Sequence, residues 1–367
     1  MIKKTFFESI IEAGEQQSVI THMRNQKLPL VLWGVGDMAS EVYEYLSEEG
    51  IKVDAVCVDD GFYEKDMSFN GYRVERLSDI ELRYNEYNVI VGHSYYENID
   101  CFKNSHKSIK EVFALCSVSY GAHEITDIEY IRERIEEYER VYNLLEDDLS
   151  RNCFIQFLNA RISGDYRYVL NAFGKYMNYF NNDLFRVESN EVYIDIGAYD
   201  GDSIKLFLKE SNGKFGYIYA LEPDNSSRNK LIDYINKEKL HDVIVSSNGA
   251  WNSKRKLCFD SDSTQESSFI MDESDGESID VDRVDDMFDY KQPPTLIKIN
   301  YFYGVEEGIE GCSELLKKYR PKVACTVGFD ADRIRTIPNI IHEINSDYKI
   351  YLRFNRAMTS ALTLYAI

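Results

Sequence analysis

Short apolar runs recur along this chain, and several of them end at glycine or acidic residues before a helical pattern begins. The clearest run spans residues 192–196, where Val, Tyr and Ile are interrupted only by Asp195. A turn with two glycines follows, and from Asp202 onward the apolar positions take helical spacing. This pattern predicts a buried strand, a tight turn and a helix.

The same alternation continues through the second half of the sequence. Helices are predicted at residues 306–319 and 334–345, and strands at residues 217–221, 243–245, 257–259, 296–299 and 323–327. Residues 278–287 are predicted to be a strand followed by a turn. Two last runs, residues 348–353 and 362–366, predict an antiparallel hairpin. Strands that alternate with helices favour a doubly wound α/β domain, which we expect over residues 183–367.

A second α/β pattern, with strands predicted at residues 28–33, 53–58, 88–92 and 112–116, predicts a Rossmann-like domain over residues 1–125. Gly34 and Gly36 follow its first strand in a GxGxxA turn, and Asp59 ends its second strand. These three residues are placed to hold the pyrophosphate and ribose of a dinucleotide, or of a sugar nucleotide. The favoured alternative is a domain of the same fold kept as a scaffold or for recognition of a partner.

Residues 126–182 separate the two α/β patterns and are predicted to be a helical linker. One apolar stripe at helical spacing runs through residues 128–145. The stripe fits packing against the protein's own domains, and it also fits a homodimer contact.

Composition narrows the class of protein. The 367 residues carry a net charge of −21, which opposes binding to nucleic acid or to anionic lipid. The seven cysteines form no CxxC pair, so we expect neither a metal site nor a disulfide framework. No apolar run reaches the roughly 18 residues of a membrane span, and no signal peptide is recognised, so we expect a cytoplasmic protein.

The ends of the predicted strands carry candidate cofactor residues. Asp195 and Asp200 flank the glycine turn, where they would repel a pyrophosphate and suit a cationic ligand. Glu222 ends the next strand and can accept hydrogen bonds from ribose hydroxyls. A third loop could hold adenine by stacking and amide contacts, and S-adenosylmethionine fits all three features. The predicted cofactor residues are Asp195, Gly197, Ala198, Tyr199, Asp200, Gly201, Glu222, Pro223, Asn248, Gly249 and Ala250.

These motifs resemble the FkbM-type family of S-adenosylmethionine-dependent methyltransferases. The matching segments are VYIDIGAYDGDS, YALEPD, NGAW, SIDVDRVDDM and LIKI, all within the second half of the chain. The resemblance implies a seven-stranded class I methyltransferase fold. It also implies transfer of a methyl group to a sugar, glycan precursor or related small molecule in bacterial surface-glycan modification. In related proteins an aromatic segment covers the cofactor, which points to Tyr176, Tyr179 and Phe180 here.

The resemblance weakens on the side of the methyl acceptor. After LIKI the family usually has an Asp and two Glu, where this chain has Asn300, Phe302 and Val305. Aromatic side chains also stand at Tyr303, Phe329 and Phe354, where the family has Gly or His. We therefore expect an apolar, partly filled acceptor pocket. The alternative is that these aromatic side chains form core, with the acceptor groups on the polar loop at residues 261–276 or on the linker helices. Either the acceptor is less polar than a sugar, or the protein is a catalytically degenerate cofactor-binding partner or regulator. The remaining catalytic candidates are Asn300, Tyr301 and Asp330.

Overall fold

A computed structural model describes residue 6 and residues 8–10, 18–93, 98–115, 126, 128–175, 177–259, 270–271 and 277–367. Tyr176 and most of the polar segment at residues 261–276 lie outside these residues. The chain divides into two compact units, each with its own sheet. The first comprises Met1–Glu139, Asn152–Gly174 and Arg356–Ala361, and the second comprises Arg140–Arg151, Lys175–Asn355 and Leu362–Ile367. None of the described helices is long and apolar enough to cross a membrane.

The first unit is built on a six-stranded sheet with the order β3-β4-β2-β1-β5-β6. All neighbouring strands are parallel except β3 and β4, which form an antiparallel pair. The four strands predicted for this unit are present, with shifted ends, and the β3–β4 pair was missed because both strands are short and mostly exposed. The strands are β1 (Leu30–Trp33), β2 (Ala55–Val58), β3 (Ser68–Phe69), β4 (Tyr72–Arg76), β5 (Tyr87–Val91) and β6 (Ile109–Phe113).

Helices α2 (Val19–Arg24), α3 (Asp37–Glu48), α4 (Leu77–Arg83) and α5 (Ile99–Ser105) complete the α/β part of this unit, with a short 3-10 helix η1 (Asp60–Phe62). A core of buried aliphatic side chains from β1, β2 and α3 holds them to the sheet. Gly34 at the end of β1 has φ +126°, and a Cβ there would lie 2.8 Å from the carbonyl oxygen of Gly92. The glycine is therefore needed for the close approach of the loops after β1 and β5.

The region predicted as a helical linker contains four helices: α6 (Ile128–Glu133), α7 (Ile135–Leu144), α8 (Asp148–Ser163) and α9 (Arg167–Ala172). Helix α8 ends at Ser163, and the next residue, Gly164, adopts φ +74°. The boundaries between the two units fall inside α7 and α8, so residues 126–182 are shared between the units.

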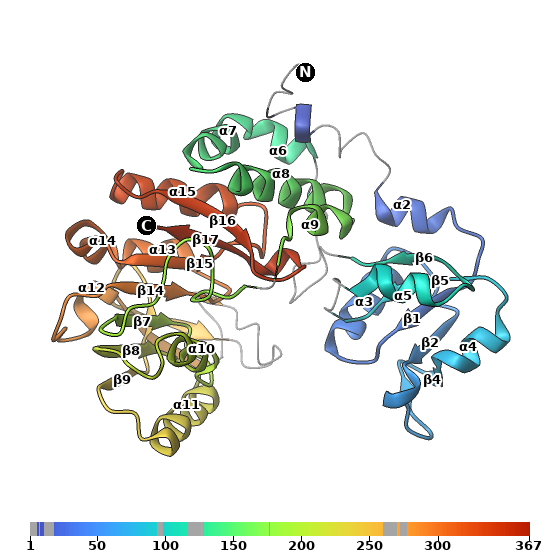
Figure 1. The fold of residues 1–367 in the computed structure, drawn as a ribbon, viewed down its shortest axis with the longest axis horizontal. Helices are drawn as coiled ribbons and strands as arrows, with labels where there is room; N and C mark the ends of the chain where they lie inside the picture. The colour runs from blue at the N-terminus through green and yellow to red at the C-terminus, as the bar shows by residue number, and fades with distance from the viewer. Residues whose placement is uncertain are drawn as a thin grey trace. The chain divides into compact units, whose positions relative to one another are not determined.

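The second unit is built on a seven-stranded sheet with the order β16-β17-β15-β14-β7-β8-β9, which can be followed from top to bottom in Figure 1. Strand β17 is antiparallel to both of its neighbours, and the other neighbouring pairs are parallel. The α/β class, the seven strands and the final hairpin are as predicted. The strands are β7 (Val192–Ile196), β8 (Tyr217–Leu221), β9 (Val243–Ser246), β14 (Leu296–Ile299), β15 (Lys322–Thr326), β16 (Ile350–Phe354) and β17 (Leu362–Ala366).

Helices of this unit connect the parallel strands, and a small sheet of order β10-β13-β11-β12 follows β9. The predicted helix 306–319 is two helices, which meet at Gly311 and Cys312, where the N–H of Cys312 donates to the carbonyl oxygen of Ile309 at 3.0 Å. The helices are α10 (Asp202–Glu210), α11 (Asn225–Glu238), α12 (Val284–Met287), α13 (Val305–Glu310), α14 (Ser313–Tyr319) and α15 (Arg333–Ile344). The 3-10 turn η3 (Thr359–Ala361) precedes β17 in the chain and belongs to the first unit. The small sheet contains β10 (Gly249–Ala250), β11 (Arg255–Phe259), β12 (Ile270–Met271) and β13 (Glu277–Asp282).

The strand order fixes where a ligand can bind. From β7 the chain adds β8 and β9 on one side and β14 and β15 on the other, so the order reverses between β7 and β14. In open α/β sheets the crevice outside the carboxyl ends of the strands at such a point is the usual binding site. The glycine turn at residues 197–201 begins there.

Candidate functional site

The turn after β7 depends on glycine. Gly197 has φ +76°, and a Cβ at this position would overlap the carbonyl oxygen of Asn300, which follows β14. Gly201, the residue before α10, has φ +87°. The positive φ angles and the close contact exclude most other residues at Gly197. The loops after β7 and β14 therefore meet at the predicted edge of the sheet.

Backbone hydrogen bonds tie this turn to the end of β8. The N–H groups of Gly197 and Ala198 both donate to the carbonyl oxygen of Leu221, at 3.1 and 3.0 Å. The N–H of Tyr199 donates to Glu222 Oε2 at 2.7 Å. Tyr199 adopts φ +49°, which is costly for a residue other than Gly, Asn or Asp. The bond to Glu222 offsets part of that cost.

Glu222 is 8% exposed, and backbone hydrogen bonds hold both of its carboxylate oxygens. Oε2 accepts from Tyr199, and Oε1 accepts from the N–H of Asp224 at 2.9 Å. Burial raises the pKa of Glu222, and these two N–H donors oppose part of the rise. Each oxygen keeps a second lone pair, so the carboxylate could still accept hydrogen bonds from two ribose hydroxyls.

Asp195 was expected to face a cationic ligand, and the structure shows it in a different environment. It is fully buried, its Oδ2 accepts from Ser203 Oγ at 2.7 Å, and its Oδ1 pairs with Lys298 Nζ at 2.9 Å. Burial raises the pKa of Asp195. At Lys298 burial lowers the pKa of the ammonium, but Asp195, together with Tyr179 and Asp202, outweighs burial and the pKa is raised. Of the two aspartates flanking the turn, only Asp200 has an open side chain, which is 33% exposed.

Asp200 also has unused hydrogen-bonding capacity. Its Oδ2 lies 3.3 Å from Lys205 Nζ, and its Oδ1 is a buried atom with no hydrogen-bond partner among the described residues. A buried oxygen without a donor is unusual in a folded protein. Asp200 is therefore the carboxylate of this turn that could receive the amino group of a bound ligand.

The loop after β9 brings Asn248, Gly249 and Ala250 to the same edge of the sheet. Asn248 is half-buried, and its N–H donates to Ser246 Oγ at 3.1 Å. The ring of Trp251 instead fills the space beside Gly304, with Arg255 over it at 4.8 Å. The backbone and side-chain amides of this loop could still contact an adenine. The Trp251 ring is packed against Gly304 instead, so it is not placed to stack on an adenine.

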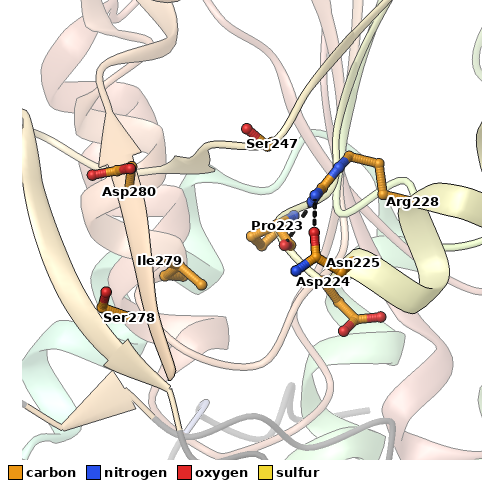
Figure 2. Close-up of a pocket in the computed structure, with 8 residues that line it drawn as sticks. All are labelled: Pro223, Asp224, Asn225, Arg228, Ser247, Ser278, Ile279 and Asp280. Atoms are coloured by element: carbon orange, nitrogen blue, oxygen red, sulfur yellow. Dashed lines mark hydrogen bonds between the residues drawn. The ribbon is translucent and has the colours of Figure 1, made fainter. Parts of the chain in front are cut away.

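A polar cavity of about 200 Å³ opens beside the end of β8. Figure 2 shows Ser278, Ile279 and Asp280 of β13 on one side, facing Pro223, Asn225 and Arg228 on the other. Arg228 Nη1 donates to the carbonyl oxygens of Glu222 and Pro223 at 2.8 and 2.7 Å, which fixes the backbone at the strand end. The cavity therefore continues the glycine-turn edge past Glu222, on the side of the small sheet.

Two of the three catalytic candidates already have structural partners. The hydroxyl of Tyr301 is buried and donates to the carbonyl oxygen of Gly304 at 2.8 Å. Asp330 Oδ1 accepts from the N–H groups of Asp332 and Arg333 at 2.8 Å each, and its Oδ2 lies 3.0 Å from Arg333 Nε. Asn300 is half-buried at the end of β14, beside the glycine turn.

Two of the four aromatic residues expected on the acceptor side lie next to each other. The rings of Phe302 and Phe329 lie 4.5 Å apart, and the guanidinium of Arg333 stands 5.3 Å from the Phe329 ring. Phe354, in contrast, is fully buried at the end of β16. Because β17 separates β16 from β15, Phe354 is displaced from this pair by about two strand spacings, roughly 10 Å. The four aromatic positions therefore do not form one cluster.

The aromatic segment before β7 has two roles. Phe180 is core, with its ring 5.3 Å from Tyr193 and 5.6 Å from Phe207. Tyr179 lies over the carboxyl edge of the sheet instead, where its hydroxyl is 2.9 Å from Thr326 Oγ1 and its ring is 5.9 Å from Lys298 Nζ.

Lys298 was missed as a site residue by the sequence argument, although a lone lysine inside the apolar run LIKI is a visible signal. Strand β14 is buried along its whole length, so the lysine must have a buried partner. That partner is the strand-end carboxylate of Asp195.

In the first unit, Gly34 and Gly36 occupy the turn between β1 and α3, as the motif predicts. Ala39 on α3 fills the space beside Gly92, because a Cβ on Gly92 would lie 2.7 Å from the Ala39 Cβ. The third position of the motif thus serves close packing of helix on strand. Asp59 follows β2 in extended conformation.

No protein-family model and no curated protein sequence matches this chain. Among solved structures, the methyltransferase FkbM from Methylobacillus flagellatus KT matches 99% of this chain and 98% of its own, with a TM-score of 0.76 and 18% identity. The chain has the fold of that FkbM methyltransferase. The likeness in fold that the motifs predicted is therefore confirmed, and it extends over both halves of the sequence.

Partial matches cover about half of the chain at low TM-score. One is the precorrin-6y C5,15-methyltransferase from Geobacter metallireducens GS-15, at 14% identity over 50% of this chain and 82% of its own, with a TM-score of 0.33. Another is an rRNA methylase from Streptococcus thermophilus, at 12% identity over 49% and 87%, with a TM-score of 0.31.

Proposed function

We propose that this protein is a methyltransferase that uses S-adenosylmethionine. The observation that carries the proposal is the glycine turn, which is locked to Glu222 at the point where the strand order reverses. The turn offers bare backbone, Glu222 offers acceptors for ribose hydroxyls, and the open Asp200 offers an acceptor for an amino group. The likeness in fold to an FkbM methyltransferase supports this assignment.

In the proposed arrangement the chain's own residues bind and orient the reactants. Glu222 and Asp200 would hold the two polar ends of the cofactor, and the loop at Asn248–Ala250 would receive the adenine. The bound cofactor supplies an electrophilic methyl group on its sulfonium. Asn300 would orient the acceptor, and the aromatic pair Phe302 and Phe329 would exclude water from it.

The acceptor we propose is a sugar, glycan precursor or related small molecule of bacterial surface-glycan modification, handled in the cytoplasm. A hydroxyl acceptor has to lose its proton when it is methylated. Asp330 and Tyr301 are engaged in structural bonds, so we expect an acceptor that needs little help from a base or that brings its own.

The structural hydrogen bonds of Asp330 and Tyr301 also favour a second function. If neither Asp330 nor Tyr301 can serve the acceptor, the protein binds the cofactor without turnover and acts as a partner or regulator. Calorimetric titration with S-adenosylmethionine and with NAD, followed by a turnover assay for S-adenosylhomocysteine with a panel of glycan precursors, tests both. Binding with turnover supports the enzyme, and binding without turnover on any acceptor supports the second function. Binding of NAD alone would refute both and point to Gly34, Gly36 and Asp59.

A further inference from the structure

Lys298 and Asp195 form an ion pair directly beneath the glycine turn. Their side chains are 2% and 0% exposed, and Lys298 lies in the middle of the sheet, on β14. Burying a lysine in a strand is costly unless the charge is paired and hydrogen-bonded. The pair is therefore held for something other than packing, since an apolar pair would fill the same space.

The ammonium of Lys298 also fixes the backbone of the turn. Besides Asp195 Oδ1, it donates to the carbonyl oxygen of Gly197 at 2.6 Å. The other end of the same peptide unit, the N–H of Ala198, donates to the carbonyl oxygen of Leu221. Lys298 on one side and Leu221 on the other thus hold the peptide between residues 197 and 198 in one orientation.

The charge of the pair matters as much as its geometry. Asp195 alone would place a negative charge under a ligand on the turn, and Lys298 cancels it at 2.9 Å. The carboxylates left around the turn to attract a cation then include Asp200, Asp202 and Glu222. Without Lys298, the same turn would favour a positively charged ligand more strongly over a neutral one of the same shape.

We propose that Lys298 is the positioning residue of the glycine turn, and that its pairing with Asp195 sets how strongly the site prefers a cationic sulfonium over a neutral thioether. This inference rests on the proposed use of S-adenosylmethionine. S-adenosylmethionine and S-adenosylhomocysteine differ by one methyl group and one positive charge, so their relative affinity reports the charge under the turn.

The test measures Kd for both ligands by calorimetry in three variants of the full chain. Lys298→Met leaves Asp195 unpaired and should raise the ratio of the S-adenosylhomocysteine Kd to the S-adenosylmethionine Kd. Asp195→Asn leaves Lys298 unpaired and should lower this ratio. One uncompensated unit charge under the turn predicts shifts of the ratio on the order of tenfold, in opposite directions in the two single variants. The double variant should return the ratio to that of the wild type.

The chain offers a matched control pair. Lys322 at the start of β15 and Glu191 just before β7 form a second ion pair, with side chains 20% and 2% exposed, at the amino ends of these strands and thus at the edge of the sheet opposite the glycine turn. Lys322→Met and Glu191→Gln should lower thermal stability and leave the affinity ratio unchanged. If either single site variant does not fold, the uncharged double variant and the remaining single variant still give the comparison.

Three outcomes decide between the claims. Opposite shifts that cancel in the double variant establish the role of the pair. An unchanged ratio in both single variants, or shifts in the same direction, overturns it while leaving the proposed function intact. Failure of the wild type to bind either ligand refutes the proposed function itself.

Discussion

Replacing Glu222 by Gln changes one oxygen to an amino group and keeps the shape of the side chain. In the wild type both carboxylate oxygens accept backbone N–H groups, from Tyr199 at 2.7 Å and from Asp224 at 2.9 Å. A carboxamide can face only one of these donors with its oxygen, so its amino group meets the other N–H. One hydrogen bond to a charged group is lost, which costs about 1.5–3 kcal/mol.

The same change should weaken cofactor binding. One of the two oxygens that could accept from the ribose hydroxyls is gone, and the turn at Tyr199 loses its anchor. A loss of about 1.5–3 kcal/mol corresponds to a roughly ten- to hundredfold rise in the Kd for S-adenosylmethionine. Calorimetric titration measures it, at a temperature where circular dichroism shows the variant folded.

Glu238, exposed at the end of α11, provides the control. Glu238→Gln removes the same charge from the same unit and should leave the Kd within about twofold, since screened surface charges contribute little. A folded Glu222→Gln protein that binds as tightly as the wild type would remove Glu222 from the cofactor site and refute the reasoning.

Three further predictions follow from the site and its support. Gly197→Ala should lower the free energy of unfolding by about 2–5 kcal/mol, because its Cβ would overlap Asn300 at φ +76°. Gly213→Ala, also at positive φ but with open space around it, should cost only about 1–2 kcal/mol in the same urea titration; equal losses would show that the contact with Asn300 is unimportant. Tyr301→Phe should cost about 0.5–1.5 kcal/mol for its hydroxyl bond and keep turnover, so a large fall in kcat would restore Tyr301 as a catalytic residue. Asp147 and Asp183 both bind the buried Arg353, which lowers the pKa of Asp183. At Asp147 burial raises the pKa, but Arg353 and the hydrogen bonds from Ser150 together outweigh burial and lower it. Depressed carboxyl pKa values give stability that is present above the ordinary value near 4 and lost as pH falls through the folded values. Urea unfolding of Asp183→Asn from pH 6 to pH 3 should therefore show a shallower loss than the wild type, by at most about 1 kcal/mol, because the Asp183 side chain is 40% exposed.

The sequence was most informative at the ends of the buried strands. The run 192–196, its glycine turn and Glu222 at the end of the next strand predicted where the site lies, because the order of parallel strands brings their carboxyl ends together. Charge pairing could not be predicted in the same way. Asp195 was expected to face a ligand, yet its partner Lys298 comes 103 residues later and meets it only through the pairing of β7 with β14.

The acceptor side was harder to predict for a related reason. Phe302, Phe329 and Phe354 each follow or end a strand, so each was expected at the same crevice. Their distances depend on the order of the strands across the sheet, and the insertion of β17 between β15 and β16 moves Phe354 away.

The position of β17 also has a consequence for synthesis. The strand pairs with β15 along one edge and with β16 along the other, and it is the last strand in chain order. Until residues 362–366 have left the ribosome, β15 and β16 each present an unpaired edge, and the hydrophobic side chains of the half-built sheet stay open to other chains. The nascent second unit should thus need protection from aggregation until residues 362–366 have been synthesised, whereas the sheet of the first unit, whose strands are all made by residue 113, can form earlier.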